Sequence, residues 1–292
     1  MASMRDIKRR KGSIQSTQQI TKAMKLVSTV KLQRAKANAE RSKTYFHAMY
    51  ETVHSILMKT GNIEHKYLKS GETGRKAVIV ITSNRGLAGG YNSNVVKLVT
   101  KGELAGEDLA IYAVGKKGRD ALGRQYEVVK DYSDYIEEPV YAEAMKISEQ
   151  VLADFENGLI SEIYLAYTGF KNTVSHVPTL LKLLPVDISA AEENQEEETQ
   201  EDLVPDNVLM NFEPEEVEAL NLLIPKYITS LIYGGMIEAV AAENGARMQA
   251  MDSATSNAEE MIEHLTLQYN RARQGSITQE LTEIIAGANA IN

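Results

Sequence analysis

The first 58 residues constrain the fold of this chain more than any other feature. From residue 3 to residue 58 there is no proline, and the only glycine is Gly12. Lys, Gln, Ala, Met, Arg and Leu dominate this stretch, and these residue types favour an α-helix. At about 1.5 Å per residue such a helix would measure about 80 Å. A compact 100-residue domain has a radius of gyration of only about 13 Å. The helix is therefore predicted to project from any domain that this chain can build.

The N-terminal segment carries a narrow apolar stripe and a strong positive charge. Its apolar positions are Ile7, Ile14, Ile20, Met24 and Val27. Residues 1–43 carry twelve basic residues against only Asp6 and Glu40, whereas residues 189–218 carry twelve acidic residues and no base. The formal net charge of -8 conceals this asymmetry. The asymmetry predicts a partner for the basic end of the chain.

A second long helix is predicted near the C-terminus, over residues 214–290. Pro214 suits the first helical position, and Pro225 is predicted to kink or restart the helix. Further on, small and apolar residues alternate by threes and fours, a period of 3.5 that is typical of a left-handed coiled coil. These positions are Met251, Ala254, Ala258, Met261, Leu265, Gln268 and Ala272. Because the two terminal helices flank one domain that joins their inner ends, the simplest fold pairs them antiparallel.

Between these helices, residues 75–188 alternate strand and helix signals. Strands are predicted over Lys76–Thr82, Asp108–Val114, Tyr126–Lys130 and Leu159–Tyr167, and helices over Asn94–Lys101, Gly115–Leu122 and Pro139–Phe155. A continuous apolar run such as KAVIVIT is typical of a buried parallel strand. The short link before Thr173–Pro185 favours antiparallel pairing of that last extended segment. The pattern indicates an open, Rossmann-like α/β domain with a mixed sheet.

The predicted fold class therefore mixes α+β and α/β features: a long antiparallel coiled coil of the N- and C-terminal helices, plus the central α/β domain. The predicted domains are an N-terminal coiled-coil helix over 1–60, the central domain over 75–188, an acidic linker and foot over 189–213, and a C-terminal coiled-coil helix over 214–292. The acidic, low-complexity part of the linker is interpreted as a solvated connector.

Composition excludes several kinds of site. The chain has no cysteine, which excludes a disulfide scaffold and a thiol nucleophile. Its five histidines show no metal-ligand spacing, and neither a metal nor another cofactor is expected. No apolar run approaches the ~20 residues that cross a bilayer, and no secretory signal is apparent. We expect a soluble or peripheral protein without direct membrane insertion.

The glycine-rich segment Ser83–Asn92 (SNRGLAGGYN) is the most tempting motif for chemistry. It follows the first predicted strand and precedes a helix, which is where phosphate-binding loops occur. The spacing matches neither G-x-G-x-x-G nor a P-loop. An α/β enzyme that binds a phosphorylated ligand here is one alternative. The favoured interpretation is a tight turn whose exposed Arg85 contacts a protein partner.

A coiled-coil protein that binds nucleic acid is a second alternative, because the first helix is so basic. Against it, aromatic residues are few, with Tyr45, Phe46 and Tyr50 clustered late in the helix. The bases also lie on several faces of the helix and form no single stripe. A lone helix with so weak an apolar stripe is marginally stable, so a larger structure is expected to surround it. No nucleic-acid partner is predicted.

Four segments of the chain resemble the gamma subunits of bacterial F-type ATP synthases. They are Ile20–Val27 (ITKAMKLV), Ser83–Asn92, Glu243–Ala258 (ENGARMQAMDSATSNA) and Tyr269–Ile284 (YNRARQGSITQELTEI). They occur in the family's order and span nearly the whole chain. The resemblance implies a rotor shaft that contributes no catalytic group. The shaft couples ion-driven rotation of a c ring to the conformational cycle of the catalytic beta subunits, and so regulates ATPase activity and proton flow.

The resemblance also implies the partners and the location of the chain. Three alpha and three beta subunits surround the coiled coil, an epsilon subunit packs on the central domain, and the c ring meets the foot. The complex lies at the cytoplasmic face of the bacterial cell membrane, with this chain peripheral to the membrane.

Matching positions of the family imply contact residues in this sequence. Contacts to the beta subunits are expected from Arg9, Arg10, Lys11, Lys22, Met24, Lys25, Arg85, Ala88, Arg247, Arg273 and Gln274, and contacts to the c ring from Phe212 and Glu213. Met24 matches a coupling position at which an added charge is harmful. Gly275 stands where members of the family often carry Ala, and glycine weakens a helix interior by about 1 kcal/mol, so a break in the helix is an open question there.

Overall fold

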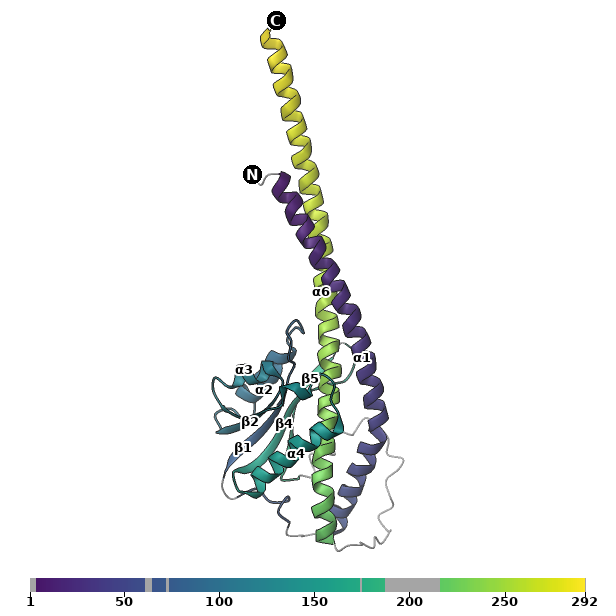
Figure 1. Cartoon of the computed structure of the whole chain (residues 1–292), viewed down its shortest axis with the longest axis vertical. Coiled ribbons are helices and arrows are strands. Elements are labelled where there is room, and N and C mark those ends of the chain that lie inside the picture. Colours follow the sequence, from purple (N-terminus) through teal and green to yellow (C-terminus); the bar gives the residue numbers. More distant parts are fainter. Residues whose placement is uncertain (1–3, 61–64, 72–73, 174, 187–215, 292) are drawn as a thin grey trace. The chain divides into compact units, whose positions relative to one another are not determined.

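The computed structural model describes residues 4–60, 65–71, 74–173, 175–186 and 216–291 (Figure 1). The chain forms two compact units, one from residues 1–29 with 247–292 and the other from residues 30–246. The two long helices, α1 (Met4–Thr60) and α6 (Glu216–Ile291), each contribute to both units. The predicted fold class is confirmed: an N-terminal helix, a C-terminal helix and a central mixed sheet.

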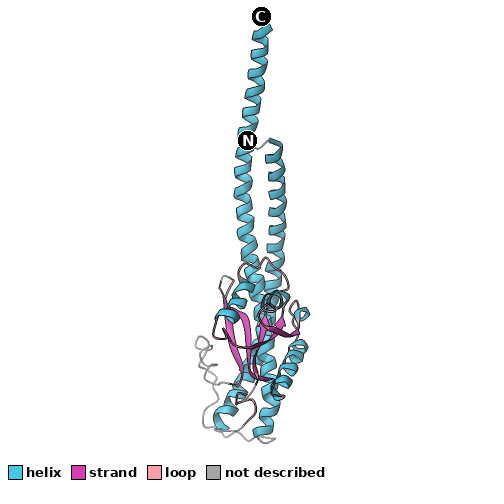
Figure 2. Ribbon diagram, turned by 90° about the vertical axis from the view of Figure 1, so that its left-hand side faces the viewer, coloured by secondary structure: helices cyan, strands magenta, loops and turns pink. Residues whose placement is uncertain are grey.

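The unit formed by residues 30–246 is built on a five-stranded sheet with the order β3-β2-β1-β4-β5, drawn in magenta in Figure 2. The strands are β1 (Arg75–Ile81), β2 (Leu109–Val114), β3 (Glu127–Asp131), β4 (Ile160–Phe170) and β5 (His176–Leu184). The first four strands run parallel, and β5 pairs antiparallel with β4, as the short connection between them predicts.

Helices cover both faces of this sheet, which explains the continuous apolar run of β1. The connecting helices are α2 (Tyr91–Lys101), α3 (Lys116–Leu122) and α4 (Tyr141–Glu156), with a short 3-10 helix η1 (Ser133–Tyr135). Ile79 and Ile81 of β1 lie in one core cluster with residues of α4 and α6. Val78 and Val80 lie in a second cluster with residues of α2. A strand buried on both faces cannot alternate apolar with polar residues.

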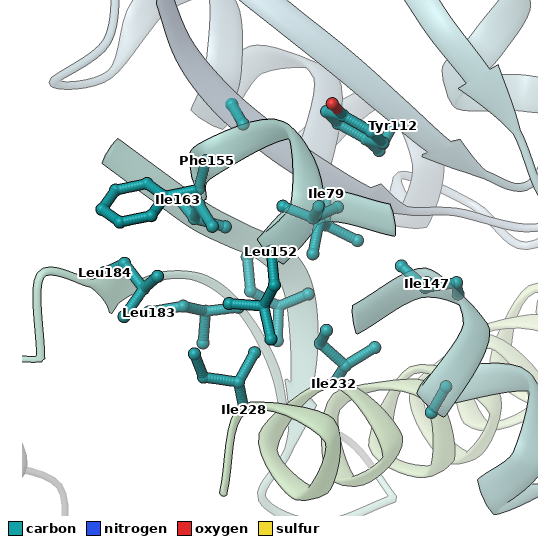
Figure 3. Close-up of a cluster of buried hydrophobic side chains, with 14 of the residues drawn as sticks. Ile79, Tyr112, Ile147, Leu152, Phe155, Ile163, Leu183, Leu184, Ile228 and Ile232 are labelled. Atoms are coloured by element: carbon teal, nitrogen blue, oxygen red, sulfur yellow. The ribbon is translucent and has the colours of Figure 1, made fainter. Parts of the chain in front are cut away.

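Helix α6 forms part of this core, and its packing overrides the proline at position 225. Ile224, Ile228 and Ile232 recur every four residues and are almost fully buried. Figure 3 shows Ile228 and Ile232 beside Leu183 of β5 and Leu152 of α4. Of the two predicted alternatives at Pro225, a kink or a restart, the restart is wrong, because one helix continues through the proline. Apolar burial of about 1.5–3 kcal/mol per large side chain outweighs the roughly 3 kcal/mol that an interior proline costs.

Helix α6 also continues through Gly275 without a break. A Cβ atom built on Gly275 would meet no atom within 4 Å, so the glycine is not required by close packing among the described residues. Ser276 and Gln279 have the spacing of a helix-capping pair, but they lie inside the continuous helix α6 and start no new helix.

Candidate functional site

In the unit formed by residues 1–29 and 247–292, α1 and α6 lie side by side and antiparallel (Figure 2). Three side-chain pairs join them. The Lys25 ammonium lies 2.6 Å from the Asp252 carboxylate, the Thr21 and Thr255 hydroxyls lie 2.7 Å apart, and the Gln18 amide donates to the Glu259 carboxylate at 2.9 Å. As the α1 number rises, the α6 number falls, which defines the antiparallel direction.

The seam on α6 is a heptad repeat that the sequence predicts only in part. Met251, Ala258 and Leu265 are buried, as predicted. Met261 and Gln268, however, are exposed. The predicted Ala254 and Ala272 are partly buried, and so are Thr255, Ile262 and Tyr269, which the prediction does not include. The predicted pattern adds a seam residue three residues after each buried residue, whereas Thr255, Ile262 and Tyr269 lie four residues after Met251, Ala258 and Leu265. The prediction follows small and apolar residues and therefore omits the threonine.

The seam on α1 is mostly polar around its centre. Ile7 is buried and Ile14 is half-buried, as the apolar stripe predicts. Thr21 and Ser28 continue the seam and are both buried. Ile20 and Val27, which the stripe also includes, are each 57% exposed. The prediction of an apolar stripe is wrong at these two residues, because the polar pairs to α6 turn them outward.

The predicted basic contact residues lie on several faces of α1. Arg9, Arg10 and Lys22 are exposed. Arg9 lies 3.4 Å from Asp6 on its own helix. Lys11 and Lys25 are half-buried at seam positions. A surface pair such as Arg9 with Asp6 contributes little to stability, and the guanidinium remains accessible to another chain.

Four predicted contact residues of the same unit differ in exposure. Arg273 and Gln274 of α6 are exposed, whereas Met24 of α1 and Arg247 of α6 are half-buried. Beyond Gln274, the apolar side chains of Ile277, Leu281, Ile284 and Ile285 are all exposed. These four positions share one helix face at spacings of four, three and one, and the sequence prediction does not include them. Contiguous exposed apolar surface is uncommon on monomeric soluble proteins.

The glycine-rich loop belongs to the other unit, and its own polar side chains hold it in place. The Asn84 amide donates to the carbonyl of Ser133 at 2.8 Å and accepts from the Lys116 amide at 3.0 Å. Asn92 accepts from the Ser83 amide at 2.9 Å. The loop therefore bridges the connections that follow β2 and β3. The side chains of Asn84 and Asn92 thus form hydrogen bonds within the fold and are not free to bind a phosphate.

The tip of this loop presents one cation and one apolar side chain to solvent. The Arg85 side chain is 77% exposed and lies 3.7 Å from Glu137. Leu87 is 63% exposed and has a φ of 63°, a left-handed conformation that leucine rarely adopts. Ala88 is buried against Tyr91 and Ala242, so its side chain is not part of the exposed surface of the loop. Nothing in the sequence distinguishes the conformation of Leu87, since only the folded loop imposes it.

Helix α6 contacts the first residue of α2, which lies at the C-terminal end of this loop. The Tyr91 hydroxyl donates to the carbonyl of Ala239 at 3.1 Å. In open α/β sheets, ligands bind at the carboxyl ends of strands where the strand order reverses. Here the order reverses between β1 and β4. Gly235 of α6 packs against Ile81 of β1 and Leu165 of β4, within this unit.

Shifted pKa values occur in the interior of this unit. Burial raises the pKa of the Glu238 carboxyl on α6, although the Phe170 amide partly offsets the shift. Burial also lowers the pKa of His65, whose ring contacts Asn221 at 3.1 Å. Neither residue is near Arg85 or Leu87 in the described contacts. Burial is the largest cause of both shifts.

Two further predicted contact residues, Phe212 and Glu213, lie outside the described residues. They are the predicted contacts to a c ring. Among the residues that the structure describes, no three His, Cys, Asp or Glu side chains gather where they could hold a metal ion. None of the described helices combines the length and apolarity needed to span a membrane.

The geometry defines a class of protein: a mixed α/β sheet domain whose chain begins and ends in long helices that pair antiparallel. Comparison with known proteins gives the family. The family model described as ATP synthase matches residues 3–291. The ATP synthase gamma chain of Lachnoclostridium phytofermentans is 65% identical over 293 residues and is covered completely, as is this chain. The chain belongs to the gamma-chain family of ATP synthases.

Further relatives agree with this placement. The sodium ion specific ATP synthase gamma chain of Acetobacterium woodii is 42% identical, with 99% of each chain covered. Among solved structures, a chain of the Euglena gracilis mitochondrial ATP synthase OSCP/F1/c-ring structure aligns with a TM-score of 0.68 at 18% identity, covering 99% of this chain and 94% of that chain. A chain of the Tetrahymena thermophila mitochondrial ATP synthase central stalk and c ring aligns with a TM-score of 0.58 at 24% identity, covering 80% and 99%. These structural likenesses concern the fold.

Proposed function

We propose that this chain is the rotor shaft of an ATP synthase and that it works by differential contact, contributing no catalytic group itself. The single observation that carries this proposal is the 65% identity to a gamma chain over the full length of both chains. In such a mechanism each orientation of the shaft stabilises a different conformation of the surrounding catalytic subunits, and the ligand affinities of those subunits follow.

The paired helices are the proposed contact with a ring of three alpha and three beta subunits. Arg9, Arg10 and Lys22 carry accessible positive charge on α1. Bases on several faces suit a shaft that meets acidic loops on successive beta subunits as it turns. The polar, sparsely apolar character of α1 supports this role, because extensive apolar packing against a ring would oppose rotation.

Helix α6 supplies the second proposed contact with the ring. Exposed Arg273 and Gln274 carry hydrogen-bonding groups, and half-buried Arg247 lies nearer the N-terminal end of the same helix. The exposed stripe from Ile277 to Ile285 gives this end of the helix an apolar surface. Such a surface is normally covered in an assembled protein. We assign it to the ring as well.

The loop tip of the α/β unit is the third proposed contact with a beta subunit. Arg85 and Leu87 are its exposed side chains, whereas buried Ala88 supports the loop from within. A left-handed leucine costs on the order of 1–2 kcal/mol. A strained residue whose side chain is exposed supports a contact made only in the complex.

The remaining partners follow from the same family. An epsilon subunit is assigned to the α/β unit, and a c ring is assigned to the segment that includes Phe212 and Glu213. The assembled complex would hold this chain at the cytoplasmic face of the bacterial membrane, as a peripheral subunit that does not itself enter the bilayer.

Two experiments test the proposal: capture of the other subunits by the tagged chain, and ATP-driven ion pumping by the assembled complex. The tagged full-length chain, expressed with the other subunits, is expected to retain alpha, beta and epsilon subunits in one complex. When that complex is joined to its membrane part in sealed vesicles, ATP is expected to drive ion uptake. Recovery of the chain as a free protein from cells that contain the other subunits would contradict the proposal. So would nucleotide binding by the isolated chain, seen as a rise in its melting temperature.

A further inference from the structure

The three polar pairs between α1 and α6 form a regular ladder. Successive rungs are Gln18 with Glu259, Thr21 with Thr255, and Lys25 with Asp252. Each rung advances by three or four residues on α1 and retreats by three or four on α6. This is the spacing of core positions in a heptad repeat. On α1 the ladder residues occupy seam positions, whereas on α6 only Thr255 does, and the exposed Asp252 and Glu259 flank the buried Met251 and Ala258.

The middle rung depends most strictly on alignment. The Thr21 hydroxyl also lies 3.0 Å from the Gln18 carbonyl, and the Thr255 hydroxyl lies 2.7 Å from the Met251 carbonyl. Two hydroxyl protons thus serve three oxygen contacts, and the bond between helices forms when one threonine directs its proton across the seam. Thr21 is buried, so a partner without a hydroxyl would leave this group without an interhelix hydrogen bond.

The outer rungs add charge and direction. The Lys25 and Asp252 side chains are 39% and 58% exposed, so their attraction contributes little to stability in water. The ion pair instead discriminates between alignments of the two helices. An alignment that places a like charge or an apolar residue opposite Lys25 is unfavourable. The Gln18 amide donates to the Glu259 carboxylate, and this charge-assisted hydrogen bond is stronger than a neutral one.

The apolar part of the seam cannot fix the alignment as strictly. Alanine at position 258 leaves α6 smooth between the two larger buried residues, Met251 and Leu265. A slip by one heptad in one direction would move Ile14 from a position opposite Ile262 to one opposite Tyr269, so an apolar contact would be kept. The ladder would not survive it: Thr21 would face Ile262 after a slip in one direction and Met248 after a slip in the other.

We propose that Gln18, Thr21 and Lys25, with their partners Glu259, Thr255 and Asp252, are positioning residues that fix the register of the antiparallel helix pair. The inference rests on the three contacts and does not need the proposed function. It gives Lys25 a role within the chain, in addition to any contact with a beta subunit. A fixed register keeps the contact residues of α1 and α6 at constant relative heights along the pair.

The test uses introduced cysteines as reporters, since the natural chain contains none. Extending the ladder by seven residues places Ile14 opposite Ile262 in the native register. A one-heptad slip places Ile14 opposite Tyr269. The variants Ile14→Cys/Ile262→Cys and Ile14→Cys/Tyr269→Cys of the full-length chain therefore report native and slipped registers. Disulfide yield under mild oxidation is measured for both pairs in parallel.

With the natural ladder, the native pair is expected to dominate. In chains that also carry Thr21→Val, Thr255→Val, Lys25→Leu and Asp252→Leu, the helices still pair. The ratio of the slipped to the native disulfide yield is expected to rise by about tenfold. A change of this size corresponds to a typical coupling energy between contacting residues. An unchanged ratio would overturn the proposal.

A charge exchange keeps the test decisive if the apolar variant does not fold. Lys25→Asp alone places two carboxylates at one rung and is expected to raise the slipped fraction or to prevent folding. Lys25→Asp combined with Asp252→Lys restores opposite charges and is expected to restore the native ratio. If the exchange restores neither the ratio nor the fold, or if Lys25→Asp alone changes nothing, the ladder does not set the register. Capture of the other subunits by the natural chain is scored separately, so failure here leaves the proposed function to its own test.

Discussion

Helix α6 takes part in two regions that differ sharply in how they hold their partners. In the unit of residues 30–246 it buries Ile224, Ile228 and Ile232 in a core shared with the sheet. In the unit of residues 1–29 and 247–292 it meets α1 through a seam that includes three polar pairs. The first region obtains stability from apolar burial. In the second region we propose that the polar pairs set the alignment, and apolar residues such as Ile20 and Ile284 are exposed.

The largest effect is expected from a cavity in the sheet core. Ile163 of β4 is fully buried between α4 and α6. Ile163→Ala is expected to lower the free energy of unfolding by about 2–5 kcal/mol, because it removes apolar contacts and leaves a cavity. The matched control is Ile20→Ala on the exposed face of α1, for which a change within about 0.5 kcal/mol is expected. Urea unfolding followed by circular dichroism measures both. Equal losses of unfolding free energy in the two variants would contradict the proposed difference between the two regions.

A charge on the paired helices is expected to affect coupling more than folding. Met24 is half-buried on α1, and Met261 is exposed on α6 in the same unit. Met24→Lys is expected to reduce the number of ions pumped per ATP hydrolysed in reconstituted vesicles, with a change in unfolding free energy of about 1 kcal/mol or less. Met261→Lys adds the same charge elsewhere and serves as the control. Unchanged pumping per ATP in Met24→Lys would remove Met24 from the contact surface.

A buried carboxyl in the sheet unit gives a pH-dependent contrast. Burial raises the pKa of Glu238 above its usual value. The folded protein therefore holds this proton more tightly than the unfolded chain does. The stability contributed by protonated Glu238 is present below the unfolded pKa and is lost as the pH rises through the folded pKa. Glu238→Gln keeps an oxygen to accept from the Phe170 amide and is expected to stabilise the protein by on the order of 1 kcal/mol at pH 8, with no gain at pH 4.

Thermal melts of Glu238→Gln and of the natural chain at both pH values measure this effect. Glu149→Gln is a matched control, because Glu149 is an exposed residue of α4. A gain of the same size at both pH values, or a gain in the control, would show that burial of the Glu238 charge is not the cause.

The smallest effect is expected at Gly275, on the exposed part of α6. A Cβ atom there meets no other atom among the described residues, and alanine favours a helix interior by about 1 kcal/mol over glycine. Gly275→Ala is expected to raise the helical signal and the melting temperature slightly. Ser276→Ala at the next, half-buried position is expected to change the melting temperature less. A lower melting temperature in Gly275→Ala would contradict this expectation.

The sequence predicts the regular part of this fold well. The apolar run of β1 indicates a parallel strand, and the short connection before β5 indicates an antiparallel one, as the sheet has them. Met251, Ala258 and Leu265 repeat every seven residues and mark one side of the α6 seam. These features depend on local pattern and on burial, which the order of apolar and polar residues records directly.

The features that the sequence does not predict depend on contacts across the fold. Thr21 and Thr255 look like surface residues until the two helices are aligned, since only the pairing gives their hydroxyls a partner. The packing of Ile224 and Ile228 carries the helix through Pro225. Leu87 takes its left-handed conformation only because the loop around it is held by hydrogen bonds. The proposed contact residues depend on the surfaces of other chains, which the order of residues in this chain does not record.

The most direct measurement is rotation of the assembled complex. Glu149 is exposed on α4, so Glu149→Cys in the cysteine-free chain gives one attachment point for a visible bead. With the alpha and beta subunits fixed to a surface, addition of ATP is expected to turn the bead continuously in one direction, at a rate that rises with the rate of hydrolysis. Steady ATP hydrolysis beneath a bead that is attached but does not turn would contradict the account.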